Sequence, residues 1–278
     1  MLYKNNNTKA LDMNVFENPS SEYRGAPFWS WNALLDKDRL ENQIQCFKEM
    51  GFGGFYMHPR CGMETKYLSD EFFKCIAQCI ESAKEKGMKA CLYDEDRWPS
   101  GFAGGLVTKT PKYRQRAMYI TADKASLPNL KLNKEHAVED GKSYLIGCYD
   151  VEFTENGFLK SYRMIESTDT AVHNKYYAYS KTDVPLGKYN FQTYTDIMQK
   201  KAVERFIELT HKKYFEKFGC EYGDTVPTVF SDEPRHRPLK QMEENPKSVG
   251  VYYWTYDLDE SFKKEYGYDI VQRLPKLV

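Results

Sequence analysis

Carboxylates that directly follow an apolar segment are the residues of this chain best suited to chemistry. In "TVFSDEPRHRP" (228–238), an apolar run ends at Phe230 and is followed by Asp232, Glu233 and His236. Two carboxyl groups across a cleft can cleave a glycosidic bond, one as the acid and the other as base or nucleophile. Glu233 is the first candidate for the acid, because burial at the end of an apolar strand favours a protonated carboxyl group. The alternative is a surface ion pair between Asp232 and a neighbouring arginine.

A second acidic cluster lies in "CLYDEDRWPSG" (91–101), where Asp94, Glu95, Asp96 and Trp98 follow another apolar run. Asp94 and Glu95 are candidates for the second catalytic carboxylate, or for holding a sugar through its hydroxyl groups. Asp94 and Asp96 could instead bind Ca²⁺, which prefers oxygen ligands, although no EF-hand pattern supports this. An ordinary solvated loop is the remaining reading, since "WPSG" is typical of turns.

Two further segments end in residues that could contact a ligand. "APFWSWN" (26–32) supplies aromatic rings, and "GFGGFYMHPR" (51–60) ends in a histidine and an arginine. Sugar C–H faces pack on aromatic rings, and arginine can bind two hydroxyl groups or a carboxylate at once. A lone histidine at a strand end is more often structural than catalytic. The candidates for substrate binding are Trp29, Trp31, Asn32, His58, Arg60, Asp96, Trp98, Asp232 and His236.

The elements that must position these residues follow a repeating pattern. Each apolar segment is followed by an amphipathic helical pattern, the first of which begins after Asp36 and the second at the cap Ser69. A long helix is expected over 199–218, ending at Gly219. Short apolar strands alternating with helices predict a parallel α/β sheet. Because ligands bind at the carboxyl ends of such strands, the four clusters are expected to meet at one edge.

The repeat is interrupted after Gly105 by β-rich segments, so we expect a small antiparallel insertion that includes a hairpin at "TENG" (154–157). The expected organisation is a polar entry at 1–24, a partial barrel domain at 25–112 and 191–278, and the insertion at 113–190. A closed (β/α)8 barrel needs about 200–250 residues. Only four βα units are visible, so the sheet is either an open four-stranded one or the first half of a longer barrel. We favour an incomplete barrel, with a missing C-terminal half or with self-association.

Composition excludes several classes of protein. Among 278 residues, 40 basic and 40 acidic side chains cancel, which argues against binding to nucleic acid or to a membrane surface. No apolar stretch is long enough to cross a membrane, and the first residues show no secretory signal, so a cytoplasmic location is expected. Seven cysteines without a CxxC motif are expected to be reduced thiols. No phosphate-binding loop, dinucleotide fingerprint or serine-hydrolase elbow occurs, and five histidines make a histidine-rich metal site unexpected.

Several motifs together resemble the N-terminal part of a family of large bacterial glycoside hydrolases related to the family 106 α-L-rhamnosidases. They are "PFWSWN", "GFGGFYMHPR", "YDEDRWPSGFAGG", "ERFIELTHKKYFEKFG" and "FSDEP". The resemblance implies a (β/α)8 barrel followed by β-sandwich domains, catalytic carboxylates at strand ends, and a calcium ion in the rhamnosidases. The "DEP" is also similar to the "NEP" of many barrel glycosidases, with Glu233 at the position of the acid. Family members are much longer, and the sugar is not carried over.

The expectation is therefore a carbohydrate-active hydrolase domain in which Glu233 is the general acid. The rivals are a non-catalytic carbohydrate-binding remnant and an assembly module that pairs through exposed sheet edges.

Overall fold

The chain divides into two units in the computed structural model, which describes residues 10–243 and 247–278. The first unit comprises residues up to 104 together with 205–234, and the second comprises 105–204 and 235–278. No helix in the described part of the chain is long and apolar enough to span a membrane. The first nine residues of the expected polar entry lie outside the described residues. Its remainder contains a short helix, α1 (Met13–Glu17).

The first unit contains an open sheet of four parallel strands in the order β1-β2-β3-β9, which is the order in which they occur along the chain. The strands are β1 (Phe28–Trp31), β2 (Gly54–Pro59), β3 (Lys89–Tyr93) and β9 (Val229–Phe230). The helices are α2 (Lys37–Glu49), α3 (Asp70–Glu85) and α6 (His211–Phe218), together with the part of α5 (Lys200–Leu209) from residue 205 onward. This confirms an α/β chain with a parallel sheet, whereas no closed barrel forms among the described residues.

Helix boundaries in this unit follow local capping chemistry. The Asp36 side chain accepts a hydrogen bond from the N–H of Arg39 at the start of α2, and Ser69 caps α3 in the same way. The expected single helix over 199–218 is two helices, because Thr210 between α5 and α6 has a non-helical backbone. Its hydroxyl and its N–H both donate to the carbonyl of Phe206, at 2.7 and 3.0 Å. The break makes His211 the first residue of α6.

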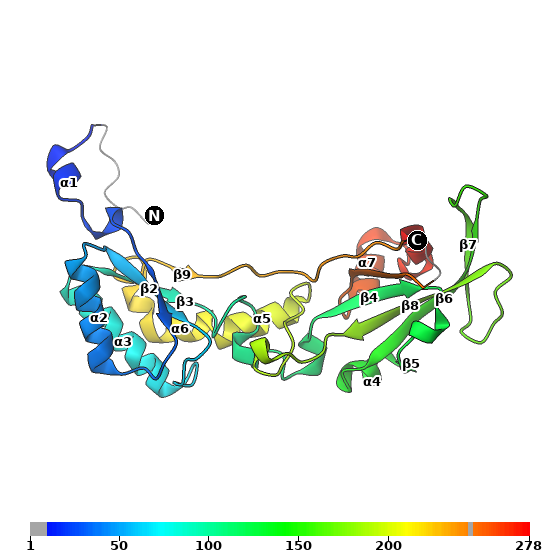
Figure 1. Cartoon of the computed structure of the whole chain (residues 1–278), viewed down its shortest axis with the longest axis horizontal. Coiled ribbons are helices and arrows are strands. Elements are labelled where there is room, and N and C mark those ends of the chain that lie inside the picture. Colours follow the sequence, from blue (N-terminus) through cyan, green and yellow to red (C-terminus); the bar gives the residue numbers. More distant parts are fainter. Residues whose placement is uncertain (1–9, 244–246) are drawn as a thin grey trace. The chain divides into compact units, whose positions relative to one another are not determined.

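The core of the first unit lies between one face of the sheet and the helices α2, α3 and α6 (Figure 1). Alternate strand residues face this core, and Phe55, Ile44 and Ala90 are completely buried there. The opposite face carries a second set of rings that contact one another; these are Phe28, Tyr56, His58, Tyr93 and Phe230. The helices that contribute to this core therefore all cover the same face of the sheet.

The second unit contains a mixed sheet in the order β10-β4-β8-β6-β5, with β7 paired to β6 (Figure 1). Its strands are β4 (Arg116–Thr121), β5 (Leu130–Lys131), β6 (Ser143–Phe153), β7 (Leu159–Ile165), β8 (Asn174–Thr182) and β10 (Val249–Tyr253), and its helices are α4 (Lys134–Glu139) and α7 (Leu258–Tyr266). The hairpin expected at 154–157 joins β6 to β7. Its core includes Met118, Val151, Trp254 and Leu274.

Two features of the second unit differ from the expected insertion. The strand β5 runs parallel to β6, because α4 crosses over between them, so the sheet is mixed rather than antiparallel. The unit also extends beyond 113–190. Strand β10 pairs with β4, and residues 235–278, which we expected in the barrel domain, belong to this sheet and its core.

Candidate active site

The four parallel strands end at the same edge of the first sheet, so the polar residues that follow them lie along that edge. Asn32 follows β1, Arg60 follows β2, Asp94 follows β3, and Asp232 lies two residues after β9. The pairing of β3 with β9 continues past the strand end, because the N–H of Asp94 donates to the carbonyl of Phe230 at 3.1 Å. Parallel pairing therefore brings these loops together.

Asp94 joins the loop after β3 to the start of α6 through its two oxygens. The carboxylate is completely buried, and its Oδ1 accepts a hydrogen bond from the Ser100 hydroxyl at 2.6 Å. Its Oδ2 lies 2.9 Å from Nε2 of His211, whose side chain is 36% exposed. A buried carboxylate thus orients an accessible imidazole, an arrangement that suits a group handling protons.

Ser100 joins the loop after β3 to the segment after β9. Its N–H donates to the carbonyl of Asp232 at 2.8 Å, and its hydroxyl oxygen accepts from the N–H of Asp232, also at 2.8 Å. The same hydroxyl donates to Asp94, and the residue is completely buried. Ser100 is therefore placed to hold the two loops together, and its geometry does not suit a nucleophile.

Glu95 is completely buried and accepts hydrogen bonds from five backbone N–H groups. The distances run from 2.5 to 3.1 Å, and the donors are Asp96, Gly101, Phe102, Ala103 and Gly104. Burial raises the pKa of Glu95 to about 8, and the hydrogen bonds from these N–H groups act in the opposite direction. With both oxygens surrounded by donors of its own loop, Glu95 organises residues 96–104 and does not face a substrate.

Glu233 is an exposed carboxylate in this group, with a left-handed backbone conformation (φ 45°). The indole Nε1 of Trp98 donates to its Oε2 at 3.2 Å, so the loops after β3 and β9 also meet here. Asp232 beside it is half-buried. Its pKa is raised by burial and by the charge of Glu233, and Arg60 opposes this shift. We expected Glu233 to be buried at the strand end, but in the structure Asp232 is the more buried of the two.

His58 lies beneath this edge, stacked on Tyr93 with ring centroids 3.8 Å apart and planes at 14°. It is 4% exposed. Burial, together with the nearby charge of Arg60, lowers the pKa of His58 to about 4, so the ring is neutral near neutral pH. Arg60 itself is exposed. His58 therefore supports Tyr93, the residue before Asp94, and Arg60 is the member of the pair that a ligand could reach.

Trp29 and Trp31 do not lie at the site. They are 6% and 2% exposed and belong to the core under α2 and α3, where Trp29 donates to the side chain of Gln43 at 2.9 Å. Their rings are edge-on to Phe55 and Phe72 respectively. A sugar has no access to either ring face, so the expected stacking role is not available to them.

The remaining sequence candidates are spread over both units. Asn32 is exposed after β1, and Asp96 is buried and paired with Arg97 at 2.8 Å. His236 belongs to the second unit, where its ring contacts Tyr253 with centroids 5.1 Å apart. The structure thus brings together the candidates that follow β2, β3 and β9, and His236 is not among them.

A calcium site at Asp94 and Asp96 finds no support in the contacts of these two residues. The oxygens of Asp94 contact Ser100 and His211, and Asp96 contacts Arg97. Within the described ranges, no group of three or more histidine, cysteine or acidic side chains is placed to hold a metal ion.

Two residues of the site were not predicted from the sequence. Ser100 was assigned to a turn, and His211 lay inside what was expected to be one continuous helix. The signal for His211 was the pair "TH" at 210–211, since a threonine can end one helical segment by bonding back to the preceding turn. Its contact with Asp94, distant in sequence, has no local signal.

No protein-family model and no curated protein matches this chain.

Proposed function

We propose that this chain is the catalytic part of a glycoside hydrolase related to the α-L-rhamnosidases, and that its site is the edge where β3 and β9 end. The observation that supports this most is the joining of two acidic loops, in which Ser100 holds Asp94 beside Asp232 and Trp98 holds Glu233. Hydrolysis of a glycosidic bond requires carboxyl groups at such a junction.

The proposed roles follow from exposure. Glu233 is the proton donor to the leaving oxygen, because it is exposed and its side chain is oriented by Trp98. Asp232 is the second carboxylate that a substrate can approach, and burial and the charge of Glu233 raise its pKa. Asp94 positions His211, and Glu95 shapes the loop, so neither transfers a proton to the sugar.

The sheet is consistent with the barrel architecture that this function implies. A doubly wound sheet carries helices on both faces and reverses its strand order, whereas a (β/α)8 barrel adds strands sequentially with helices outside. Here the strand order is sequential, and α2, α3 and α6 cover the same face. We propose that the aromatic face, which includes Tyr93 and Phe230, is the inner face of such a barrel.

The test is hydrolysis of aryl and alkyl glycosides by the protein and by Glu233→Gln. The substitution keeps the shape and removes the transferable proton. General acid catalysis is worth roughly 10²–10⁴ in rate, so turnover of an alkyl glycoside should fall by about that factor. Turnover of an aryl glycoside with a good leaving group should fall much less, since that leaving group departs without protonation.

Equal slowing of both substrates, or of neither, would show that Glu233 is not the acid, and Asp232→Asn would then be tested in the same way. Sugar binding without any hydrolysis by the unmodified protein would contradict the catalytic proposal and favour the carbohydrate-binding alternative.

A further inference from the structure

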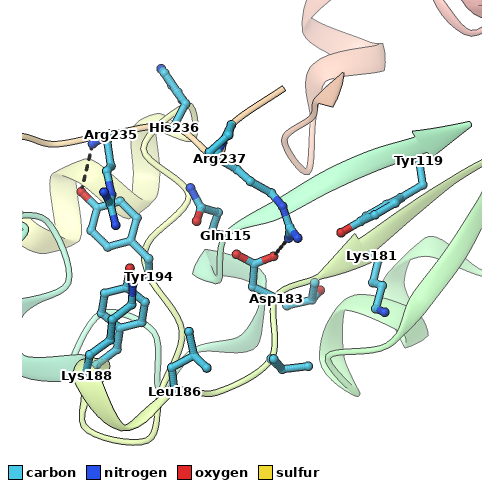
Figure 2. A pocket seen from close by; sticks show the side chains of 14 residues that line it. Gln115, Tyr119, Lys181, Asp183, Leu186, Lys188, Tyr194, Arg235, His236 and Arg237 are labelled. Carbon is cyan, nitrogen blue, oxygen red and sulfur yellow. Dashed lines mark hydrogen bonds and ion pairs between the residues drawn. The ribbon is translucent and has the colours of Figure 1, made fainter. Parts of the chain in front are cut away.

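A pocket lies wholly within the second unit, and none of the carboxylates described above lines it. Its volume is about 350 Å³, at the lower end of the range of about 300–1,000 Å³ typical of small-molecule sites. Residues from β4, from the end of β8 and from 235–238 line it, and Tyr189 and Tyr194 form buried parts of its wall (Figure 2). This volume suits a small molecule rather than a polymer segment.

The pocket concentrates positive charge. Four cationic side chains line it, two lysines and two arginines, against the single carboxylate of Asp183, an excess of three positive charges. The whole chain has a net charge of zero, so this excess is local and does not reflect composition. Lys181 and Lys188 are exposed, and neither forms part of the core. A concave site with one sign of charge attracts ligands of the opposite sign.

Among these cations, Arg237 contacts three neighbours that line the same pocket. It pairs with Asp183, and its guanidinium lies over the ring of Tyr119 at 5.6 Å (Figure 2). Gln115, with its amide oriented to satisfy both neighbours, donates to Asp183 at 3.1 Å and accepts from the N–H of Arg237 at 3.3 Å. A guanidinium has five N–H donors in a rigid fork, so the Asp183 pair leaves donor capacity for an anion.

The segment that supplies the arginines is attached to this unit. The N–H of Arg235 donates to the hydroxyl of Tyr194 at 3.4 Å, and Lys240 exchanges backbone hydrogen bonds with Val251 of β10 at 2.9 and 2.7 Å. The nearby Tyr189 carries the Lys188 ammonium over its ring at 4.7 Å. Contacts within the protein therefore position Arg237 and Lys188 at the pocket in the absence of a ligand.

We propose that this pocket binds a small anionic molecule of about sugar-ring size, in which a carboxylate or phosphate meets Arg237 and the lysines. The proposal concerns the second unit alone and holds whether or not the strand-end site hydrolyses glycosides.

The test is binding of glucuronate, glucose 6-phosphate and glucose to the whole protein at low ionic strength, measured by calorimetry and by amide chemical shifts. At least one of the two anions should bind and should shift the amide signals of residues 115–119 and 181–189. The anion that binds more tightly shows whether the pocket prefers a carboxylate or a phosphate. Glucose should bind at least about tenfold more weakly. In K181Q/K188Q the affinity for the anion should fall about tenfold, because two of the four cations that line the pocket lose their charge.

The matched control is K264Q, which removes an exposed lysine of α7 outside the pocket and should leave binding unchanged. The proposal would be overturned if neither anion bound, if glucose bound equally well, or if K181Q/K188Q and K264Q behaved alike. It would also be overturned if the shifted amides lay outside the pocket.

Discussion

Asp94 and Glu95 are adjacent and equally buried, yet their oxygens have different partners. Asp94 contacts two side chains, Ser100 of the same loop and His211 of α6, whereas Glu95 accepts hydrogen bonds only from the backbone of the loop that follows it. The residue type alone therefore does not separate a carboxylate that positions a site from one that shapes a loop. The number and the origin of the donors do.

The first prediction concerns Glu95→Gln, which keeps the side-chain shape but replaces one accepting oxygen with an amide donor. That donor would face backbone N–H groups in a completely buried site, leaving at least two of them without a partner. Each unsatisfied buried group costs about 1–3 kcal/mol, so the free energy of unfolding should fall by about 3 kcal/mol or more. Urea unfolding would measure this. The exposed Glu85→Gln is the control, and equal effects of the two substitutions would contradict the proposed role of Glu95.

The second prediction is a pH dependence that arises from His58. Its pKa is about 4 in the folded protein and 6.5 in a model peptide, so the unfolded chain binds a proton that the folded protein does not. The free energy of unfolding is therefore unaffected by His58 above pH 6.5, and it falls as the pH drops from 6.5 toward 4, because proton uptake favours the unfolded chain. The total is about 3 kcal/mol, from about 1.4 kcal/mol per unit of pKa. His58→Phe should remove this part of the slope in urea titrations over that range. If the free energy of unfolding depended on pH equally in the two proteins, His58 would take up its proton in the folded protein as readily as in the unfolded chain.

At the scale of the elements, the sequence was sufficient for the four parallel strands and for the caps of α2 and α3. Apolar runs and capping residues are local signals, and the structure forms these elements for local reasons. The face of the sheet to which each strand side chain points could not be predicted in the same way. In β1, residues on both faces are aromatic, so the two-residue alternation does not tell which of Phe28, Trp29 and Trp31 meets the helices.

The break between α5 and α6 shows the same limit for helices. The apolar positions continue across it, and Tyr214 and Phe218 still face the core. Hydrophobic spacing therefore predicted one helix, while the Thr210 hydroxyl and backbone produced two. The contact between His211 and Asp94 depends on this break and on the packing of α6 beside β3, and neither follows from a short segment.

The third prediction tests whether Ser100 joins the loops after β3 and β9. Ser100→Ala removes a donor to Asp94 and an acceptor for the N–H of Asp232. The free energy of unfolding should fall by about 2–6 kcal/mol, from two groups at about 1–3 kcal/mol each. Hydrogen exchange at the Asp232 amide should become faster. The exposed Ser30→Ala of β1 should change stability by less than about 0.5 kcal/mol. An unchanged exchange rate at Asp232 would show that this loop is held in another way.

At the scale of the whole chain, the division into units was harder to predict than the elements. The chain leaves the first unit at 104, returns at 205 and leaves again at 234. The second departure carries β10 to the edge of β4, with Val249 opposite Thr121 and Tyr253 opposite Ala117. Pairing between strands so distant in sequence depends on complementary edges and a shared core, and the apolar pattern of 249–254 alone fits either unit.

The last prediction follows from the separate cores of the two units. Phe55 is completely buried in the first core and Val151 in the second, and each packs only with residues of its own unit among those described. Phe55→Ala should cost about 3–5 kcal/mol through lost burial and the cavity that remains. Native-state hydrogen exchange should then become faster in β2 and β3 while β6 and β8 keep their protection. Val151→Ala should produce the reverse pattern at a smaller cost, because it removes fewer buried atoms. Equal acceleration in both sheets, for either substitution, would mean that the two cores unfold as one cooperative unit.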